Sequence, residues 1–425
     1  MQLKLVKRFG WGLGDQALSS LTNFALGVLV ATSVSTHDFG EFNLIFATYL
    51  LVLSVSRALA TEPLVIRYTN TDEATWRDAA RAASGTAFAI SIVAGVVCIV
   101  GGLIAGGVGG GAFVVLGLML PGLLVQDSWR FVFFSRARGA HAFLNDLAWA
   151  ILLLGAAGSA HFLDRHNVAL FVLCWGGAAG LAGIYGMYQL GLLPRPGRIM
   201  TWWHAHRGLS VRLAVQFMAT SGIVQASVYA VALLASATAL GSLRGASLLL
   251  GPSQVLVMGA GLVAVPEGAR ALRHSRHALR RLVLAVSLAI GVFASLWGVV
   301  AYNLPDSWGR SILGATWDSA HDLVVPVTIT MVAAGIAAGA TSGIRALGAA
   351  SHSLRGGIVA AAMMATGSIW GAAINGAEGC AWGGAIAAWA TVPVWWTQFH
   401  RALREHGPSS SAEKPLEVVD HTRVG

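Results

Sequence analysis

Charge is the scarcest property of this sequence. Asp, Glu, Lys and Arg make up 11% of its 425 residues, whereas about 25% of the residues of a soluble domain are charged. This excludes an ordinary globular enzyme. The hydrophobic share is 56% and the mean hydropathy is +0.67, and several apolar runs approach the ~20 residues that cross a ~30 Å hydrocarbon core. We therefore expect an all-α integral membrane protein.

Cysteine and catalytic motifs are also sparse. The three cysteines, Cys98, Cys174 and Cys380, lie far apart in apolar stretches, which argues against a disulfide framework or a metal site. The glycine run at 106–111 has no Lys and Ser/Thr of a phosphate-binding loop. We expect no enzyme activity, no metal, no catalytic residue and no cofactor, apart from an H⁺ or Na⁺ that could couple to transport.

Twelve apolar segments predict about twelve transmembrane helices. They fall at 13–34, 42–61, 85–107, 112–134, 144–163, 168–191, 212–235, 246–266, 281–302, 322–344, 356–376 and 380–399.

The distribution of basic residues predicts the orientation. With the N-terminus in the cytoplasm, 24 of the 28 Lys and Arg fall in inner segments, Arg165, Arg244 and Arg310 fall outside, and Arg57 lies within a span. Cytoplasmic loops collect basic residues in this way. We expect a multi-pass protein of the cytoplasmic (cell) membrane with both termini inside. The bias accounts for most of the net charge of +9 without a nucleic-acid partner.

Four short patterns recur in the same order in the two halves of the chain. Their positions are 63–67 and 266–270, 121 and 326, 136–140 and 345–349, and 175–178 and 382–385. Because six spans is an even number, the two halves share one orientation. We expect two six-helix lobes, at 1–193 and 212–400, related by a pseudo-two-fold axis along the membrane normal. A cytoplasmic linker at 194–211 and a disordered cytoplasmic tail at 401–425 complete the expected organisation.

Longer motifs resemble a known family. They are FGEF at 39–42, ATEPLVIR at 60–67, VQDSWRFVFFSRARG at 125–139, LRGASLLLGPSQVL at 243–256 and LGATWDSAHDLVVP at 313–326. The chain resembles, over roughly 10–400, the polysaccharide-transport branch of the MOP superfamily, the Wzx-type flippases, which are related to MATE multidrug exporters.

The resemblance implies a flippase that works by alternating access. It would move a polyprenyl-pyrophosphate-linked oligosaccharide from the inner to the outer leaflet for cell-surface polysaccharide biosynthesis. Membrane lipids would surround it, and glycosyltransferases or a polymerase would be its protein partners. The alternatives are a MATE-like exporter of cations or drugs and a non-transporting scaffold for glycosyltransferases.

Ionisable residues within spans are costly, so each is a candidate for function. In the first half these residues are Asp15, Arg57, Glu62, Asp127, Arg130 and Asp146. Arg57 and Arg130 suit a pyrophosphate, and the acids would hold the arginines or bind a coupling ion. Alternatively, the set is a salt-bridge cluster that joins helices, an interpretation favoured for Asp146 and Glu62 near span ends. Asp127 and Arg130 share one helical face and can partly neutralise each other.

The second half offers fewer candidates. Arg244 begins the eighth span and is either the outer end of the substrate path or an interfacial anchor. Pro252 should open that helix, with Gln254 beside it. Gln216 stands at the position equivalent to Asp15, offset by 201. Among the tryptophans, we expect Trp129 and Trp149 to line the cavity, whereas those at span ends, Trp395 and Trp396 included, mark the bilayer interface.

Overall fold

The computed structural model describes residues 2–163 and 167–406, and the described chain is helical throughout, without a strand. The all-α fold is therefore confirmed. The expected disordered tail lies outside the described residues from position 407 onward, whereas residues 401–405 continue the last helix.

The first half of the chain forms a bundle that we call the amino lobe. Its elements are α1 (Gln2–Ser33), α2 (Thr36–Ser56), η1 (Arg57–Thr61), α3 (Glu62–Tyr68), α4 (Glu73–Ala105), α5 (Gly107–Ser135), α6 (Gly139–Phe162) and α7 (Val168–Leu190). Both η1 and the later η3 are π-helical turns. The turn before α4 is capped by Asp72, whose carboxylate accepts the Thr75 backbone N–H at 2.9 Å, and this hydrogen bond lowers the pKa of Asp72.

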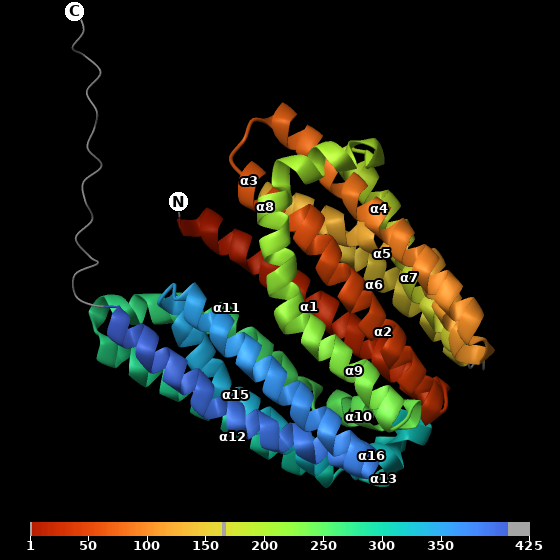
Figure 1. Cartoon of the computed structure of the whole chain (residues 1–425), viewed down its shortest axis with the longest axis vertical. Helices are drawn as coiled ribbons and strands as arrows, with labels where there is room; N and C mark the ends of the chain where they lie inside the picture. The colour runs from red at the N-terminus through yellow and green to blue at the C-terminus, as the bar shows by residue number, and fades with distance from the viewer. Residues whose placement is uncertain (1, 164–166, 407–425) are drawn as a thin grey trace, which may run out of the picture.

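The second half follows through a connecting segment into what we call the carboxyl lobe, which begins near residue 212 and ends at residue 405. The elements are η2 (Pro196–Arg198), α8 (Ile199–Phe217), η3 (Met218–Gly222), α9 (Ile223–Leu234), α10 (Ala237–Leu249), α11 (Gly251–His274), α12 (Arg276–Tyr302), α13 (Asp306–Leu313), η4 (Gly314–Thr316), α14 (Trp317–His321), α15 (Val324–Ala346) and α16 (Ala350–Glu405). Figure 1 shows the two lobes as separate bundles, with α8 and α9 running from one to the other.

Ten helical segments within the described residues are long and apolar enough to cross a membrane. This number takes α16 as one piece, although non-helical Asn375 and Gly376 divide it, and it omits α1. Counting α1 and both arms of α16 gives the twelve spans expected from hydropathy.

Close backbone contacts join the helices of two hairpins. A Cβ at Gly95 in α4 would come within 2.5 Å of the Gly117 carbonyl oxygen in α5. In α16, a Cβ at Gly371 would come within 1.9 Å of the Gly379 carbonyl oxygen. Small residues allow such approach inside a membrane, where packing replaces the hydrophobic effect as the driving force.

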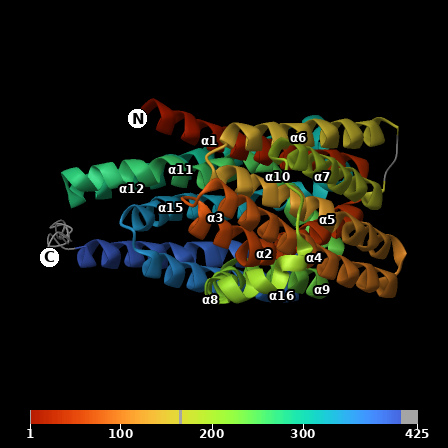
Figure 2. The same cartoon turned by 90° about the horizontal axis from the view of Figure 1, so that it is seen from above.

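The connecting residues 194–211 are mostly helical and are held by the amino lobe. The Trp202 Nε1–H donates to the Leu59 carbonyl at 3.0 Å, and Arg195 and Arg198 both pair with Asp78 of α4. We call the end of the molecule that carries α3 and the start of α8 the basic end, because the turns there hold the arginines assigned to the inside. The opposite end, with α13 and the turn between α4 and α5, is the far end (Figure 1), and Figure 2 shows the same helices from above.

The two lobes converge at the far end (Figure 1). Gly40 of α2 lies against the backbone of Ala237, and Gly241 of α10 lies against the backbone of Thr36; a Cβ at these positions would come within 1.7 and 2.0 Å of the respective carbonyl oxygens. The hydroxyl of Ser242, the residue after Gly241, donates to the Ser319 hydroxyl of α14 at 2.8 Å. The far end is therefore closed in this conformation.

Candidate functional site

A two-pronged ion pair joins α2 to α5. Arg57 donates from Nε to Asp127 Oδ2 at 3.0 Å and from Nη2 to Asp127 Oδ1 at 2.5 Å. The Asp127 side chain is 8% exposed and that of Arg57 is 30% exposed. Arg57 also begins the π turn η1, and its guanidinium carbon lies 5.1 Å from the centre of the Phe131 ring. The turn and the ring position the guanidinium against Asp127.

A second cluster joins α1, α5 and α6 around Arg130. Its Nε donates to Asp15 Oδ2 at 2.7 Å and lies 3.5 Å from Asp146 Oδ2. The Asp15 and Asp146 side chains are 0% and 2% exposed. Gln126 donates to Asp146 Oδ1 at 2.8 Å, whereas Asp15 Oδ1 is buried without a hydrogen-bond partner among the described residues.

The two groups together have unequal charge. Three carboxylates, those of Asp15, Asp127 and Asp146, face two guanidiniums, so the fully ionised cluster carries one excess negative charge. An uncompensated charge at such a depth is strongly unfavourable. One bound proton or one monovalent cation would balance the charge of the cluster.

Asp127 and Arg130 form no ion pair with each other within the described structure, because each faces a different neighbouring helix. Glu62, the first residue of α3, is half-buried and likewise has no ion pair among the described residues.

Arg244 lies between the lobes and, within the described structure, has no acidic partner. It projects from α10, and its guanidinium carbon lies 5.6 Å from the centre of the Phe46 ring of α2. Phe46 belongs to an aromatic group with Tyr49 and Trp175. A cation over an aromatic face is stabilised without losing its hydrogen-bond donors, so these donors stay available to an anion.

The helix break expected at Pro252 is present. α10 ends at Leu249, and Pro252 lies in the first turn of α11. The Leu249 carbonyl accepts the Trp297 Nε1–H at 2.9 Å. This carbonyl near the break is therefore already hydrogen-bonded within the protein. Gln254 is half-buried and makes no side-chain hydrogen bond with the described residues.

Trp129 and Trp149 lie inside the amino lobe. Trp129 is fully buried and packs against Gly186, and Trp149 is 6% exposed. The indole N–H groups of both are buried without a partner among the described residues. Neither ring is among the residues that line five cavities of the described structure, and a place at the substrate cavity stays a prediction for both.

The sequence did not predict that Gln126 and Asn145 belong to the cluster. Gln126 bonds to Asp146, and Asn145 donates to the Ala182 carbonyl at 2.9 Å and to Gln189 at 3.1 Å. Both are amides directly beside a predicted aspartate. That adjacency within an apolar run is a signal that could have identified them.

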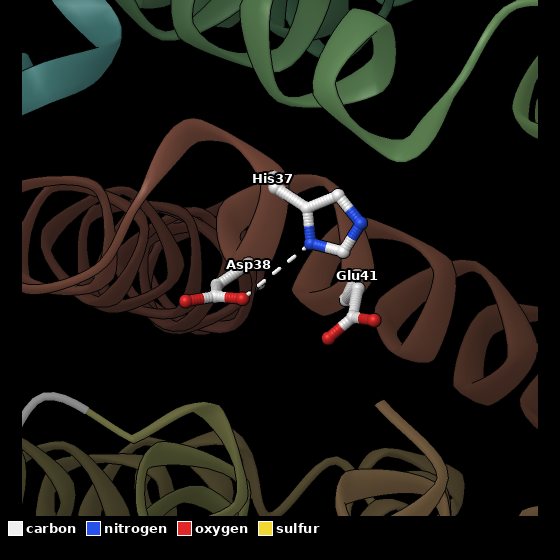
Figure 3. A group of neighbouring side chains, drawn as sticks. All are labelled: His37, Asp38 and Glu41. Carbon is white, nitrogen blue, oxygen red and sulfur yellow. Dashed lines mark ion pairs between the residues drawn. The ribbon is translucent and has the colours of Figure 1, made fainter. Parts of the chain in front are cut away.

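Figure 3 shows three side chains at the start of α2, His37, Asp38 and Glu41, whose nitrogen and oxygen atoms lie within 4.8 Å of one another. His37 Nδ1 is 3.5 Å from Asp38 Oδ1. All three come from the first turns of one helix, and His37 is exposed. Acidic residues are common at a helix N-terminus for electrostatic reasons, so we assign no metal to this group.

The described helices form two lobes that meet at one end of the molecule. No protein-family model and no curated protein sequence matches the chain, but solved structures do. An inward-facing multidrug resistance MATE transporter of the MOP superfamily matches with a TM-score of 0.69 and 11% identity over 92% of this chain and 96% of its own.

The lipid II flippase MurJ, in an inward closed conformation, matches with a TM-score of 0.71 and 10% identity over 93% of this chain and 90% of its own. A MOP superfamily transporter from Pyrococcus furiosus, described as having a binding pocket of reverse polarity, matches with a TM-score of 0.56 and 14% identity over 95% and 96%. The chain therefore has the fold of MOP superfamily transporters and flippases. The Wzx-type branch stays a prediction.

Proposed function

We propose that this protein is a flippase of the cytoplasmic membrane that moves a polyprenyl-pyrophosphate-linked oligosaccharide from the inner to the outer leaflet. The observation that carries the proposal is Arg244, a cation without an acidic partner in the described structure, held over Phe46 between the lobes. A headgroup with two phosphates cannot cross ~30 Å of hydrocarbon unaided, because each desolvated charge costs several kcal/mol. Arg244, between the lobes, replaces part of the lost hydration.

The orientation of the structure agrees with entry from the inner leaflet. If the basic end lies in the cytoplasm, as the arginine distribution indicates, the closed far end faces outward. The lobes then accept a headgroup from the cytoplasmic side and release it after the contact between α2 and α10 opens. The MurJ neighbour supports a lipid-linked substrate. Glycosyltransferases and a polymerase are the expected protein partners.

The amino-lobe cluster is our candidate for coupling to an ion gradient. Its excess carboxylate and the unpartnered Asp15 Oδ1 suit an H⁺ or Na⁺ that binds in one conformation and leaves in another. The same feature favours the second candidate function, a MATE-like exporter that exchanges such an ion for an organic cation.

Arg244→Ala tests the flippase. Because Arg244 has no carboxylate partner among the described residues, its removal leaves no buried charge uncompensated, and the protein should assemble normally. In proteoliposomes with a fluorescent polyprenyl-pyrophosphate sugar, we expect flipping to fall about 10-fold or more, the loss of one or two charge-assisted hydrogen bonds.

Arg310→Ala is the matched control, since Arg310 is a far-end arginine that pairs with Asp318 on the surface. Unchanged flipping in Arg244→Ala would remove Arg244 from the path. Export of an organic cation without glycolipid flipping by the wild type would favour the MATE-like function, and no transport of either would favour the scaffold.

A further inference from the structure

Two adjoining cavities lie in the carboxyl lobe, with volumes of about 970 and 510 Å³. Both are lined by Arg345, Ala360, Met364 and Trp395. The larger lies between the α8–α9 segment and α16 and reaches the turn at 348–350. The smaller reaches Thr330, fifteen residues up α15 and thus ~22 Å deeper. We call the two together the carboxyl-lobe tract, and its volume suits a ligand of two or three sugar units.

The walls of the tract combine mostly apolar side chains with neutral polar groups. Amides and hydroxyls line the α8–α9 side, among them Gln216, Thr220 and Gln225. Among the described residues that line either cavity, Arg345 is the charged one, and no carboxylate is present. Gln216 occupies the repeat position at which the amino lobe has Asp15. The amino lobe therefore carries an acid where the carboxyl lobe carries a neutral hydrogen-bonding group.

Arg345 differs from its counterpart in the repeat, Arg136. Arg136 donates to the Thr71 and Asp72 carbonyls at 2.8 and 3.0 Å, and its guanidinium lies 4.9 Å from the centre of a Trp76 ring. Arg345 makes no hydrogen bond or ion pair with its side chain in the described structure. Its Nη1 lies 3.4 Å from the Cβ position of Gly261, which places the guanidinium across the tract, against α11.

Trp395 supplies a flat apolar wall. Its ring is half-buried, lines both cavities and packs against Gly356, where a Cβ would come within 2.7 Å of it. This ring belongs to the cavity wall as well as to a span end. An indole face packs against the C–H face of a pyranose, whereas amides and hydroxyls bond to its hydroxyl groups.

We propose that the carboxyl-lobe tract binds the sugar-phosphate headgroup of the transported lipid, with Arg345 on a phosphate, Trp395 against a sugar ring and Gln216 and Gln225 on sugar hydroxyls. This rests on the proposed flippase function and deepens it. Recognition of the glycan then belongs to the carboxyl lobe, and the amino-lobe cluster is left to ion coupling. A phospholipid headgroup such as phosphatidylglycerol offers similar chemistry, so the test must separate the two sources.

Binding to the purified full-length protein in detergent tests the proposal, with three probes: a farnesyl-pyrophosphate disaccharide, farnesyl pyrophosphate and a short-chain phosphatidylglycerol. We expect Arg345→Ala to weaken both pyrophosphate probes by about 10- to 100-fold, and Trp395→Ala to weaken only the disaccharide probe. Arg355→Ala is the matched control, because Arg355 is exposed and lines neither cavity. Arg345→Lys, which keeps the charge, should restore part of the affinity, and size-exclusion chromatography verifies folding.

Each other result overturns a different statement. If the wild type flips the glycolipid while Arg345→Ala and Trp395→Ala bind all probes as it does, the tract proposal fails and the flippase stands. If the wild type flips no glycolipid and binds no disaccharide probe, both fail. Phosphatidylglycerol bound as tightly as the disaccharide probe, with equal dependence on Arg345, would make the tract a phospholipid site and overturn the glycan assignment.

Discussion

A buried arginine paired with one carboxylate can bind substrate, join two helices or do both. For Arg57, these roles can be separated only by an experiment that measures stability and flipping together. Removal of Arg57 alone leaves Asp127 buried and unpaired, which costs about 3–5 kcal/mol of stability. We expect Arg57→Ala to lower both folding yield and flipping. The double variant Arg57→Ala/Asp127→Ala has no orphaned charge and should recover most of the stability. If Arg57 contacts the pyrophosphate, flipping stays low in both.

Thermal unfolding and flipping measured on the same preparations separate the two roles. Recovery of both stability and flipping in the double variant would show that the pair only joins α2 to α5. Among the described residues, the Arg57–Asp127 pair shares no hydrogen bond with the Arg130 group, so the double variant leaves the hydrogen bonds of that group in place.

The ionisable residues could be found from the sequence, but their partners could not. A charge within an apolar run is visible locally, and so were Asp15, Arg57, Asp127, Arg130 and Asp146. Pairing depends on how each helix is rotated. The π turn that begins at Arg57 inserts one extra residue into its span. The extra residue rotates the next helical segment by ~100°. No local sequence pattern indicates this turn. From the sequence, Arg345 counted only among the basic residues that indicate the cytoplasmic side, because the sequence does not show which helices its side chain faces.

At the scale of elements, the contact between α2 and α10 closes the far end in this conformation. Gly241 has its Cβ position 2.0 Å from the Thr36 carbonyl oxygen, so Gly241→Ala cannot fit unless α10 moves away from α2. Overpacking of this kind costs about 1–3 kcal/mol, and the cost falls only on the far-end-closed conformation. We expect the equilibrium to shift toward far-end-open states by about 5- to 150-fold.

Ser319 accepts a hydrogen bond from Ser242, the residue after Gly241. A cysteine at position 319, in a background without Cys98, Cys174 and Cys380, reports this shift through labelling with a membrane-impermeant maleimide. Labelling should rise in Gly241→Ala and stay at the parent level in Gly101→Ala, a glycine of α4 with no neighbour within 4 Å of its Cβ position. Equal labelling in all three proteins would mean that this contact is not the gate. The number of spans was predictable because hydropathy is local, whereas this contact joins residues about 200 positions apart.

For the whole molecule, the two lobes carry different charge: an acid-rich cluster in the amino lobe, and in the carboxyl lobe a tract whose charged lining residue is Arg345. We infer that ion and glycolipid bind on opposite sides of the moving interface.

Neutralising one acid should then abolish coupling without breaking the cluster, because Asp15→Asn leaves two carboxylates for two guanidiniums. We expect wild-type flipping in proteoliposomes to accelerate under an imposed H⁺ or Na⁺ gradient. Asp15→Asn should flip, with or without a gradient, at the rate that the wild type shows in the absence of a gradient. Asp318 is an exposed acid paired with Arg310, so Asp318→Asn should respond to the gradient as the wild type does. A gradient response that survives in both Asp15→Asn and Asp146→Asn would place the coupling ion outside the amino lobe.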